Sequence, residues 1–392
     1  MIPPENETAM AERSAARPLR LLVVMPSWLG DVVMATPALR LLRDALPGSF
    51  IGGLLRPGLD ELIAGSDLLD EMHVDRARGV MGPKVVAGKI RPRRYDAALL
   101  LANPFSSALI TRLAFIPRRI GYDRDGRGLL LTDRIRPERV EEGVMGKMGV
   151  GAFSPVPAVE YYLRAARAVV GEGGEGRSQI SNFKFQGGVR LELGLTEEQE
   201  LAAREVLGKA GVREGERYAI LIPGANDVAK RWPAAGFGAV AAHLVAAHGL
   251  KVLVSGAPGE AELCDEVVRV AGGTPGGGGV VALPRFGVSI GALKGIVRGA
   301  SLMVTNDTGP RFVGSAFAVP LVNLYGPTDV RWSILPENGA PHEDVVADPT
   351  LPAELNANEH PERCRIDRIE VERVVAAVDR VMGATGSRRT TC

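Results

Sequence analysis

The feature that most constrains the fold of this chain is a regular alternation of short apolar runs with longer segments of helical periodicity. Residues 19–26 (LRLLVVMP) form an almost continuous apolar run that ends in a proline, and residues 31–46 then place their apolar side chains at helical spacing. Such a run predicts a strand buried on both faces, which is typical of parallel sheets covered by helices. The alternation therefore predicts a doubly wound α/β fold, in which ligands bind at the carboxyl ends of the strands.

The alternation occurs twice, which indicates two similar α/β halves. The first half continues with strand-like runs at residues 50–55, 72–74 and 95–102. Residues 171–188 are polar, rich in glycine and without periodicity, as expected of a linker. The strand-like runs of the second half are residues 218–222, 251–255, 280–283, 302–305 and 321–325.

The organisation expected from this pattern has five parts. Residues 367–382 have an apolar helical face, which predicts a closing helix. The parts are a disordered leader (1–18), an N-terminal Rossmann-like domain (19–180), a C-terminal Rossmann-like domain (189–366), the closing helix (367–383) and a flexible tail (384–392).

Length, charge and cysteine content exclude several classes of protein. A chain of 392 residues is long enough for two domains that each bury a core. The 47 basic and 46 acidic residues give no global case for a nucleic-acid partner. The three cysteines lie far apart, so neither a disulfide scaffold nor a CxxC metal pair is present, and a reducing cytoplasm fits best. No apolar run reaches about 18 residues, which excludes a membrane-spanning helix.

The first candidate site is residues 26–36 (PSWLGDVVMAT), where the first strand ends. Gly30 would let a ligand approach the backbone, and the helix dipole would stabilise Asp31 as an anion in the first helical turn. Asp31 is either a carboxylate that takes part in chemistry or a plain N-terminal cap of the helix.

The second candidate site is residues 223–233 (PGANDVAKRWP), which again follow an apolar strand. Lys230, Arg231 and Trp232 stand together there. A cationic loop at a strand end favours phosphate binding, because lysine is a strong point-charge donor to phosphate oxygens. The alternative is a solvated basic turn.

The third candidate site lies within residues 301–332. Asp307, Thr308 and Gly309 follow a strand and precede helix-like residues. Free N–H groups at a helix start, a hydroxyl and an unobstructed glycine favour an anion. A second strand ends at residues 325–328 (YGPT), which would place another loop beside the first and form a pocket.

Together these segments resemble glycosyltransferase family 9, the heptosyltransferases, and especially its heptosyltransferase II members. The resemblance rests on PSWLGDVVMATPALR, PGANDVAKRWP, SGAPGE, NDTGP and LYGPTDVRWS, which occur in the family's order, and it covers about residues 19–383. It implies a GT-B architecture: an acceptor-binding and a nucleotide-sugar-binding Rossmann-like domain face each other, and the last helix crosses back to the first domain. It also implies inverting transfer of a heptose from ADP-heptose to the lipopolysaccharide inner core, with no metal and no cofactor.

The resemblance assigns roles by position. Asp31 matches the base that takes the proton from the acceptor hydroxyl. Inversion needs one such base, and a lysine with a helix N-terminus can stabilise the leaving diphosphate without a metal. The donor-binding positions are Lys230 on the phosphates, Glu260 on the ribose, Asp307 on the transferred sugar, and Thr308 with Gly309 at the diphosphate.

One turn departs from the family pattern. The family usually continues as DTGPMH, whereas Arg311 and Phe312 stand in the last two places here, which leaves the donor sugar open. Arg311 is either a further phosphate contact or a surface residue at a helix start. Only Cys364 is left of the family's cysteine-rich region before the last helix, which argues against a metal there.

Other residues near the motifs have two interpretations each. The rings of Trp28 and Trp232 either stack on a sugar or adenine, or pack in the core. None of the five histidines lies in a motif segment; His243 and His248 have the pattern of ordinary helix residues, and we assign them no catalytic role. The further candidate contacts of donor or acceptor are Gly30, Arg231, Trp232 and Arg311.

Two other functions fit a doubly wound fold less well. A nicotinamide dehydrogenase would carry GxGxxG after the first strand, and this chain lacks it there. A non-catalytic sugar-nucleotide or glycolipid-binding protein is disfavoured by the presence of Asp31 with Lys230, although Phe312 favours it. Another nucleotide sugar or acceptor within the same family is the third alternative.

The distribution of charge predicts an anionic partner. Residues 76–139 hold 15 Lys or Arg against 5 Asp or Glu, a net charge of +10, so the rest of the chain sums to −9. This asymmetry favours a phosphorylated glycolipid and peripheral contact with the cytoplasmic face of the inner membrane. The aromatic residues of this stretch do not form an RNP motif, so no nucleic acid is expected.

Overall fold

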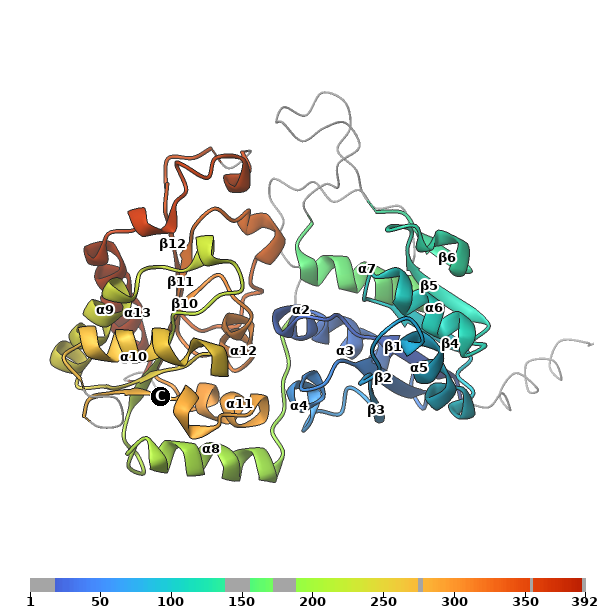
Figure 1. Ribbon diagram of the computed structural model, residues 1–392, viewed down its shortest axis with the longest axis horizontal. Coiled ribbons are helices and arrows are strands. Elements are labelled where there is room, and N and C mark those ends of the chain that lie inside the picture. The colour runs from blue at the N-terminus through green and yellow to red at the C-terminus, as the bar shows by residue number, and fades with distance from the viewer. Residues whose placement is uncertain (1–17, 138–155, 172–187, 274–277, 353–354, 390–392) are drawn as a thin grey trace, which may run out of the picture.

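Two parallel sheets of six strands each organise the chain (Figure 1). The computed structural model describes residues 18–137, 156–171, 188–273, 278–352 and 355–389. The predicted α/β class with two Rossmann-like halves is confirmed. The leader, most of the linker and the last three residues lie outside the described residues, and the domain limits stay a prediction.

The first sheet has the order β3-β2-β1-β4-β5-β6. Every strand pair in it is parallel. Its strand order reverses between β1 and β4, and ligands of doubly wound sheets bind at such a switch point. The strands are β1 (Arg20–Val24), β2 (Phe50–Leu55), β3 (Glu71–Val74), β4 (Ala97–Leu100), β5 (Arg118–Tyr122) and β6 (Asp133–Ile135).

The second sheet repeats this topology. Its order is β12-β11-β10-β7-β8-β9, which equals the order of the first sheet when counted from its own first strand, and its pairs are again parallel. The switch point lies between β7 and β10. The strands are β7 (Tyr218–Ile222), β8 (Lys251–Val254), β9 (Val280–Ala282), β10 (Leu302–Asn306), β11 (Leu321–Tyr325) and β12 (His342–Val346).

The single helix predicted over residues 31–46 is two helices. Pro37 lacks the N–H that would continue the first helix, and the Thr36 hydroxyl donates to the Val33 carbonyl at 2.7 Å in its place. The helices of this half are α2 (Leu29–Met34), α3 (Thr36–Ala45), α4 (Leu59–Ile63), α5 (Gly82–Ile90), α6 (Phe105–Leu113) and α7 (Ala158–Val170).

The closing helix forms, but it packs on the second sheet. Val374, Ala377, Val378 and Val381 are buried in the apolar core of that sheet, and the helix contacts α9, β11 and β12 (Figure 1). The expectation that it crosses back to the first domain is therefore wrong for the described residues, because the apolar face of the helix packs against the sheet of the second half. The helices of this half are α8 (Glu197–Lys209), α9 (Ala234–His248), α10 (Ala261–Val270), α11 (Ile290–Arg298), α12 (Pro310–Ala316) and α13 (Val371–Arg389).

The two halves meet through α2 and α4 on one side and α11 and α12 on the other. One apolar cluster runs through this contact and includes Val32 and Val33 of α2 with Phe312 of α12. Beside it, the buried Lys294 ammonium donates to the carbonyls of Leu62, Ala64 and Gly194 at 3.0, 2.8 and 2.9 Å. This contact fixes the carboxyl end of β1 relative to that of β10.

Within the described chain, no helix is both long enough and apolar enough to cross a bilayer.

Candidate active site

Asp31 lies in the first turn of α2, just beyond the carboxyl end of β1. Its Oδ1 accepts a hydrogen bond from the Tyr162 hydroxyl of α7 at 3.0 Å. Burial raises the pKa of Asp31, and the hydrogen bond from Tyr162 opposes that rise. The N-cap residue of α2 is Trp28 and not Asp31. A carboxylate held in one orientation with a raised pKa is suited to accept a proton.

Lys230 and Asp307 form an ion pair between two strand ends of the second sheet. The Lys230 Nζ is 3.0 Å from Asp307 Oδ2, and the carboxylate is almost completely buried while the lysine side chain stays 29% exposed. Lys230 comes from the turn after β7 and Asp307 from the turn after β10, so the pair spans the switch point. The Lys230 side chain is therefore only partly enclosed by its ion pair with Asp307.

Arg311 holds Asp307 from the other side. Its guanidinium lies 3.1 Å from Asp307 Oδ1, donates to the Ser333 carbonyl at 2.7 Å and donates to the Tyr325 hydroxyl. The side chain is completely buried, so the interpretation of Arg311 as a surface residue is wrong. Direct contact with a ligand does not fit this burial either. The guanidinium instead positions the Asp307 carboxylate.

Glu260 lies against the turn that follows β7. Its Oε2 accepts from the Ala257 N–H at 2.8 Å, and its Oε1 is 3.8 Å from Arg231 Nη2. A Cβ on Gly224 would lie 2.3 Å from the Glu260 carboxylate, so a side chain at this position would displace the carboxylate. Arg231 follows Lys230 in the sequence and pairs with Glu260, so the two predicted donor residues Lys230 and Glu260 belong to one group of neighbouring side chains.

The segments predicted to bind the acceptor and the donor touch through two glycines, Gly30 and Gly309. A Cβ on Gly30 would lie 2.8 Å from the Phe312 ring and 3.2 Å from the Gly309 Cα. A Cβ on Gly309 would in turn lie 3.1 Å from the Gly30 nitrogen. Asp31 follows Gly30 directly, and Thr308 precedes Gly309. The candidate base therefore lies in the segment that contacts the predicted diphosphate turn.

Trp232 belongs to the core. Its ring is 2% exposed and packs edge-on against Phe237, and its Nε1 donates to the Ile369 carbonyl at 3.0 Å. Stacking of this ring on a ligand is therefore wrong, and core packing is the correct alternative. Trp28, by contrast, is 63% exposed.

Sequence reasoning assigned no role to Tyr162 or Tyr325. Both are buried, and their hydroxyls contact Asp31 and Arg311 respectively. The available signal was chemical: a tyrosine within a buried apolar segment needs a partner for its hydroxyl. The sequence pattern does not show which residue the hydroxyl of Tyr162 or of Tyr325 contacts.

Comparison with known proteins settles the family. The sequence model described as "Glycosyltransferase family 9 (heptosyltransferase)" matches residues 86–336, which is more than half of the chain. The chain belongs to glycosyltransferase family 9. It is a family 9 enzyme whose predicted site residues come from both halves of the fold.

Relatives of this family 9 chain have similar length and architecture. It is 27% identical to lipopolysaccharide heptosyltransferase 2 of Salmonella typhimurium over 326 residues, covering 79% of this chain and 83% of the relative. The solved structure of E. coli ADP-heptose lipopolysaccharide heptosyltransferase II matches with a TM-score of 0.70 at 20% identity, covering 94% of this chain and all of that one. A family 9 glycosyltransferase of Veillonella parvula matches with a TM-score of 0.71 at 21% identity, covering 93% and 97%.

Proposed function

We propose that this enzyme transfers a heptose from ADP-heptose to the inner core of lipopolysaccharide, with inversion and without a metal in the reaction. Family membership and the names of the relatives support the donor and the acceptor class. The observation that supports the mechanism is the contact of α2 with the turn before α12. Asp31, the proposed proton acceptor, lies in α2, and Asp307, which pairs with Lys230 and Arg311, lies in that turn.

On the acceptor side, Asp31 takes the proton from the attacking hydroxyl. As that oxygen forms its bond to the anomeric carbon, the bond from this carbon to the diphosphate oxygen breaks and ADP leaves with the electron pair. The hydrogen bond from Tyr162 holds the carboxylate in one orientation. A positioned base of this kind contributes about 10²- to 10⁴-fold to the rate.

On the donor side, Lys230 compensates the charge that develops on the diphosphate. Asp307, held by Lys230 and Arg311, presents carboxylate oxygens to the hydroxyls of the sugar. Glu260 accepts hydrogen bonds from the ribose, and Thr308 with Gly309 forms the turn that receives the diphosphate. A fixed cation stabilises a leaving anion without reorganisation at the moment of reaction.

The transfer is tested by incubating the purified chain with ADP-heptose and a heptose-containing core acceptor and measuring ADP release. We expect release that depends on the acceptor and persists after treatment with EDTA. Release only with a different nucleotide sugar would move the enzyme to another donor, and binding of ADP-heptose without turnover would establish the non-catalytic alternative.

Lys230→Ala is expected to weaken ADP binding by about ten- to a hundredfold, since a charge-assisted contact contributes roughly 1.5 to 3 kcal/mol. Asp307 keeps its ion pair with Arg311, so the fold should survive. Calorimetric titration with ADP measures the effect. Lys209→Ala, which removes an exposed lysine of α8, is the control. Unchanged affinity in a folded Lys230→Ala protein would remove Lys230 from the donor site.

For the membrane-bound acceptor, we propose that the α5 surface of the first half rests on the cytoplasmic membrane face. Val80, Met81 and Val85 are 98%, 58% and 51% exposed at the start of α5. Exposed Lys84 and Lys89 lie on the same helix. Apolar side chains beside cations fit the boundary between acyl chains and anionic headgroups.

Vesicle sedimentation tests this contact. We expect binding to vesicles that contain anionic lipid, little binding to pure phosphatidylcholine, and loss of binding at high salt. Each basic residue near such a surface contributes about 1 kcal/mol, so replacing Lys84 and Lys89 together by alanine should weaken binding about thirtyfold. Lys209→Ala on the second half is the matched control. Equal binding to neutral and anionic vesicles at low salt would refute the contact.

A further inference from the structure

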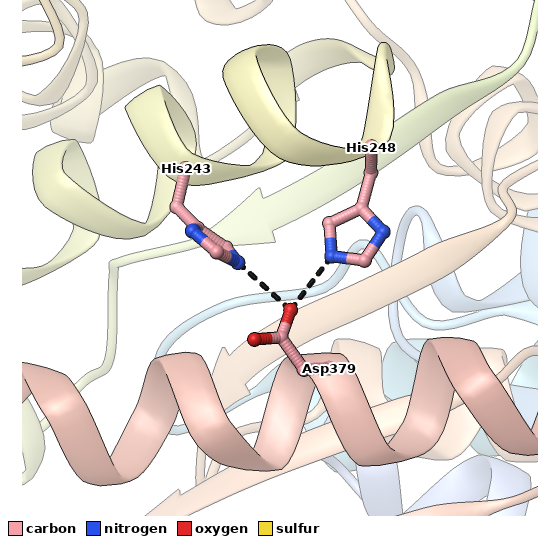
Figure 2. Close-up of side chains that lie close together, drawn as sticks. All are labelled: His243, His248 and Asp379. Carbon is pink, nitrogen blue, oxygen red and sulfur yellow. Dashed lines mark hydrogen bonds and ion pairs between the residues drawn. The ribbon is translucent and has the colours of Figure 1, made fainter.

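Two histidines of α9 converge on one aspartate of α13, on a face of the second half that the transfer mechanism does not use (Figure 2). His243 and His248 direct their Nε2 atoms at the same oxygen of Asp379, at 2.8 and 2.7 Å. The imidazole rings stand 72° apart with centroids separated by 5.4 Å, so the two nitrogens approach without stacking of the rings. The arrangement joins two helices that are far apart in the sequence.

We propose that His243, His248 and Asp379 bind a zinc ion that links α9 to α13. One ligand atom from each residue lies within 4.8 Å of the other two, and this is the metal-competent cluster found in the described part of the chain. Imidazole nitrogen and carboxylate oxygen are preferred zinc ligands, and a site with three protein ligands completes its tetrahedron with water.

Small movements convert the hydrogen-bonded geometry into a metal site. Two ligands on a tetrahedral zinc ion lie about 3.3 Å apart, given metal–ligand distances of about 2.0 to 2.1 Å. Each nitrogen–oxygen separation must therefore open by roughly half an ångström. The Asp379 side chain is 48% exposed, and both dashed lines in Figure 2 end on one of its two oxygens, so the carboxylate has room to rotate.

The exposure of the cluster also provides an entry path and the place for water. The side chains of His243 and His248 are 26% and 21% exposed, so the site is neither sealed in the core nor freely mobile on the surface. Zinc here would fasten the closing helix to the second half. The predicted effect is on stability, and it is independent of the proposed heptose transfer.

The experiment uses the full chain without a polyhistidine tag, stripped with chelator and titrated with Zn²⁺ against a chromophoric competitor. We expect one ion per chain whose affinity falls at least tenfold in His243→Ala, His248→Ala and Asp379→Asn. His342→Ala, which changes an exposed histidine of β12, is the control and should bind as the unaltered protein does. Zinc at a hundredfold its dissociation constant should raise Tm by about 3 °C.

Asp379→Asn separates a metal site from a hydrogen-bonded clamp. Asparagine keeps an oxygen that accepts from both histidines but is a poor zinc ligand, so its zinc-dependent rise in Tm should disappear while its metal-free Tm stays close to that of the unaltered protein. The proposal is overturned if zinc does not change Tm of the unaltered chain. It is also overturned if the bound ion is lost with Cys392→Ser, which removes the thiol of the last residue in the sequence, and not with the three ligand variants.

Discussion

Asp31→Asn is expected to lower turnover by about 10²- to 10⁴-fold while ADP affinity and Tm stay near those of the unaltered protein. A sugar hydroxyl is a poor nucleophile until its proton is removed, and asparagine has no basicity. The amide oxygen can still accept the hydrogen bond from Tyr162, so the local structure is preserved. The proposed ADP contacts belong to the second half and are unchanged.

The measurement is steady-state ADP release with verified donor and acceptor, beside calorimetry with ADP and thermal unfolding. Asp60→Asn is the matched control, because Asp60 lies in the first turn of α4 and its carboxylate accepts a backbone hydrogen bond from Gly58 at 2.9 Å. It should keep its activity. Near-normal turnover by Asp31→Asn would show that the Asp31 carboxylate is not the base, because asparagine cannot take up the proton of the acceptor hydroxyl.

The pH profile gives this assignment a second readout. Burial raises the pKa of Asp31, so the acid limb of kcat should lie at higher pH than an ordinary aspartate would give. Tyr162→Phe removes the hydrogen bond that lowers this pKa, and the limb should move to still higher pH, since the base must be ionised to act. A tyrosine that only packs against α2 would change Tm and leave the limb in place.

The central strands of both sheets were predictable because they are buried on both faces. The runs at residues 19–26 and 302–305 became β1 and β10, which lie next to the switch points. Three strands were not predicted: β5, β6 and β12. The last two are edge strands, and charged residues such as Asp133 and Glu343 interrupt all three, so their apolar signal is weak.

The site was predictable as a set of segments but not as a set of contacts. Strand ends, glycines and the family resemblance located the turns that hold Asp31, Lys230 and Asp307. The Asp31–Tyr162 hydrogen bond joins residues 131 positions apart, and Lys230 and Asp307 are 77 positions apart. The periodicity of the sequence does not predict such pairs, because only tertiary packing brings these distant residues together.

The burial of Arg311 could not be predicted from the sequence either. A lone arginine at a helix start is usually solvated, and only its enclosure by β11 and the turn after it makes it a core residue here.

Arg311→Met is expected to destabilise the fold by about 3 to 5 kcal/mol, because it leaves buried partners without their cation. Thermal unfolding should show a fall in Tm of about 4 to 6 °C. Arg204→Met is the control: it breaks an ion pair whose arginine is 70% exposed and whose partner Glu200 is 29% exposed, so its effect should stay below about 1 kcal/mol.

Most of the free energy of unfolding lost in Arg311→Met should come from the negative charge that is left uncompensated on Asp307. The variant leaves that carboxylate, which is 8% exposed, with Lys230 as its remaining ion-pair partner in the described chain. Adding Asp307→Asn removes the uncompensated charge, so the double variant should be more stable than the sum of the two single losses predicts, by about 0.5 to 3 kcal/mol. Chemical denaturation of both singles and the double measures this coupling. Additive losses would show that Arg311 stabilises the fold by packing against Phe312 and Tyr325 alone, and that Asp307 is positioned by Lys230 without it.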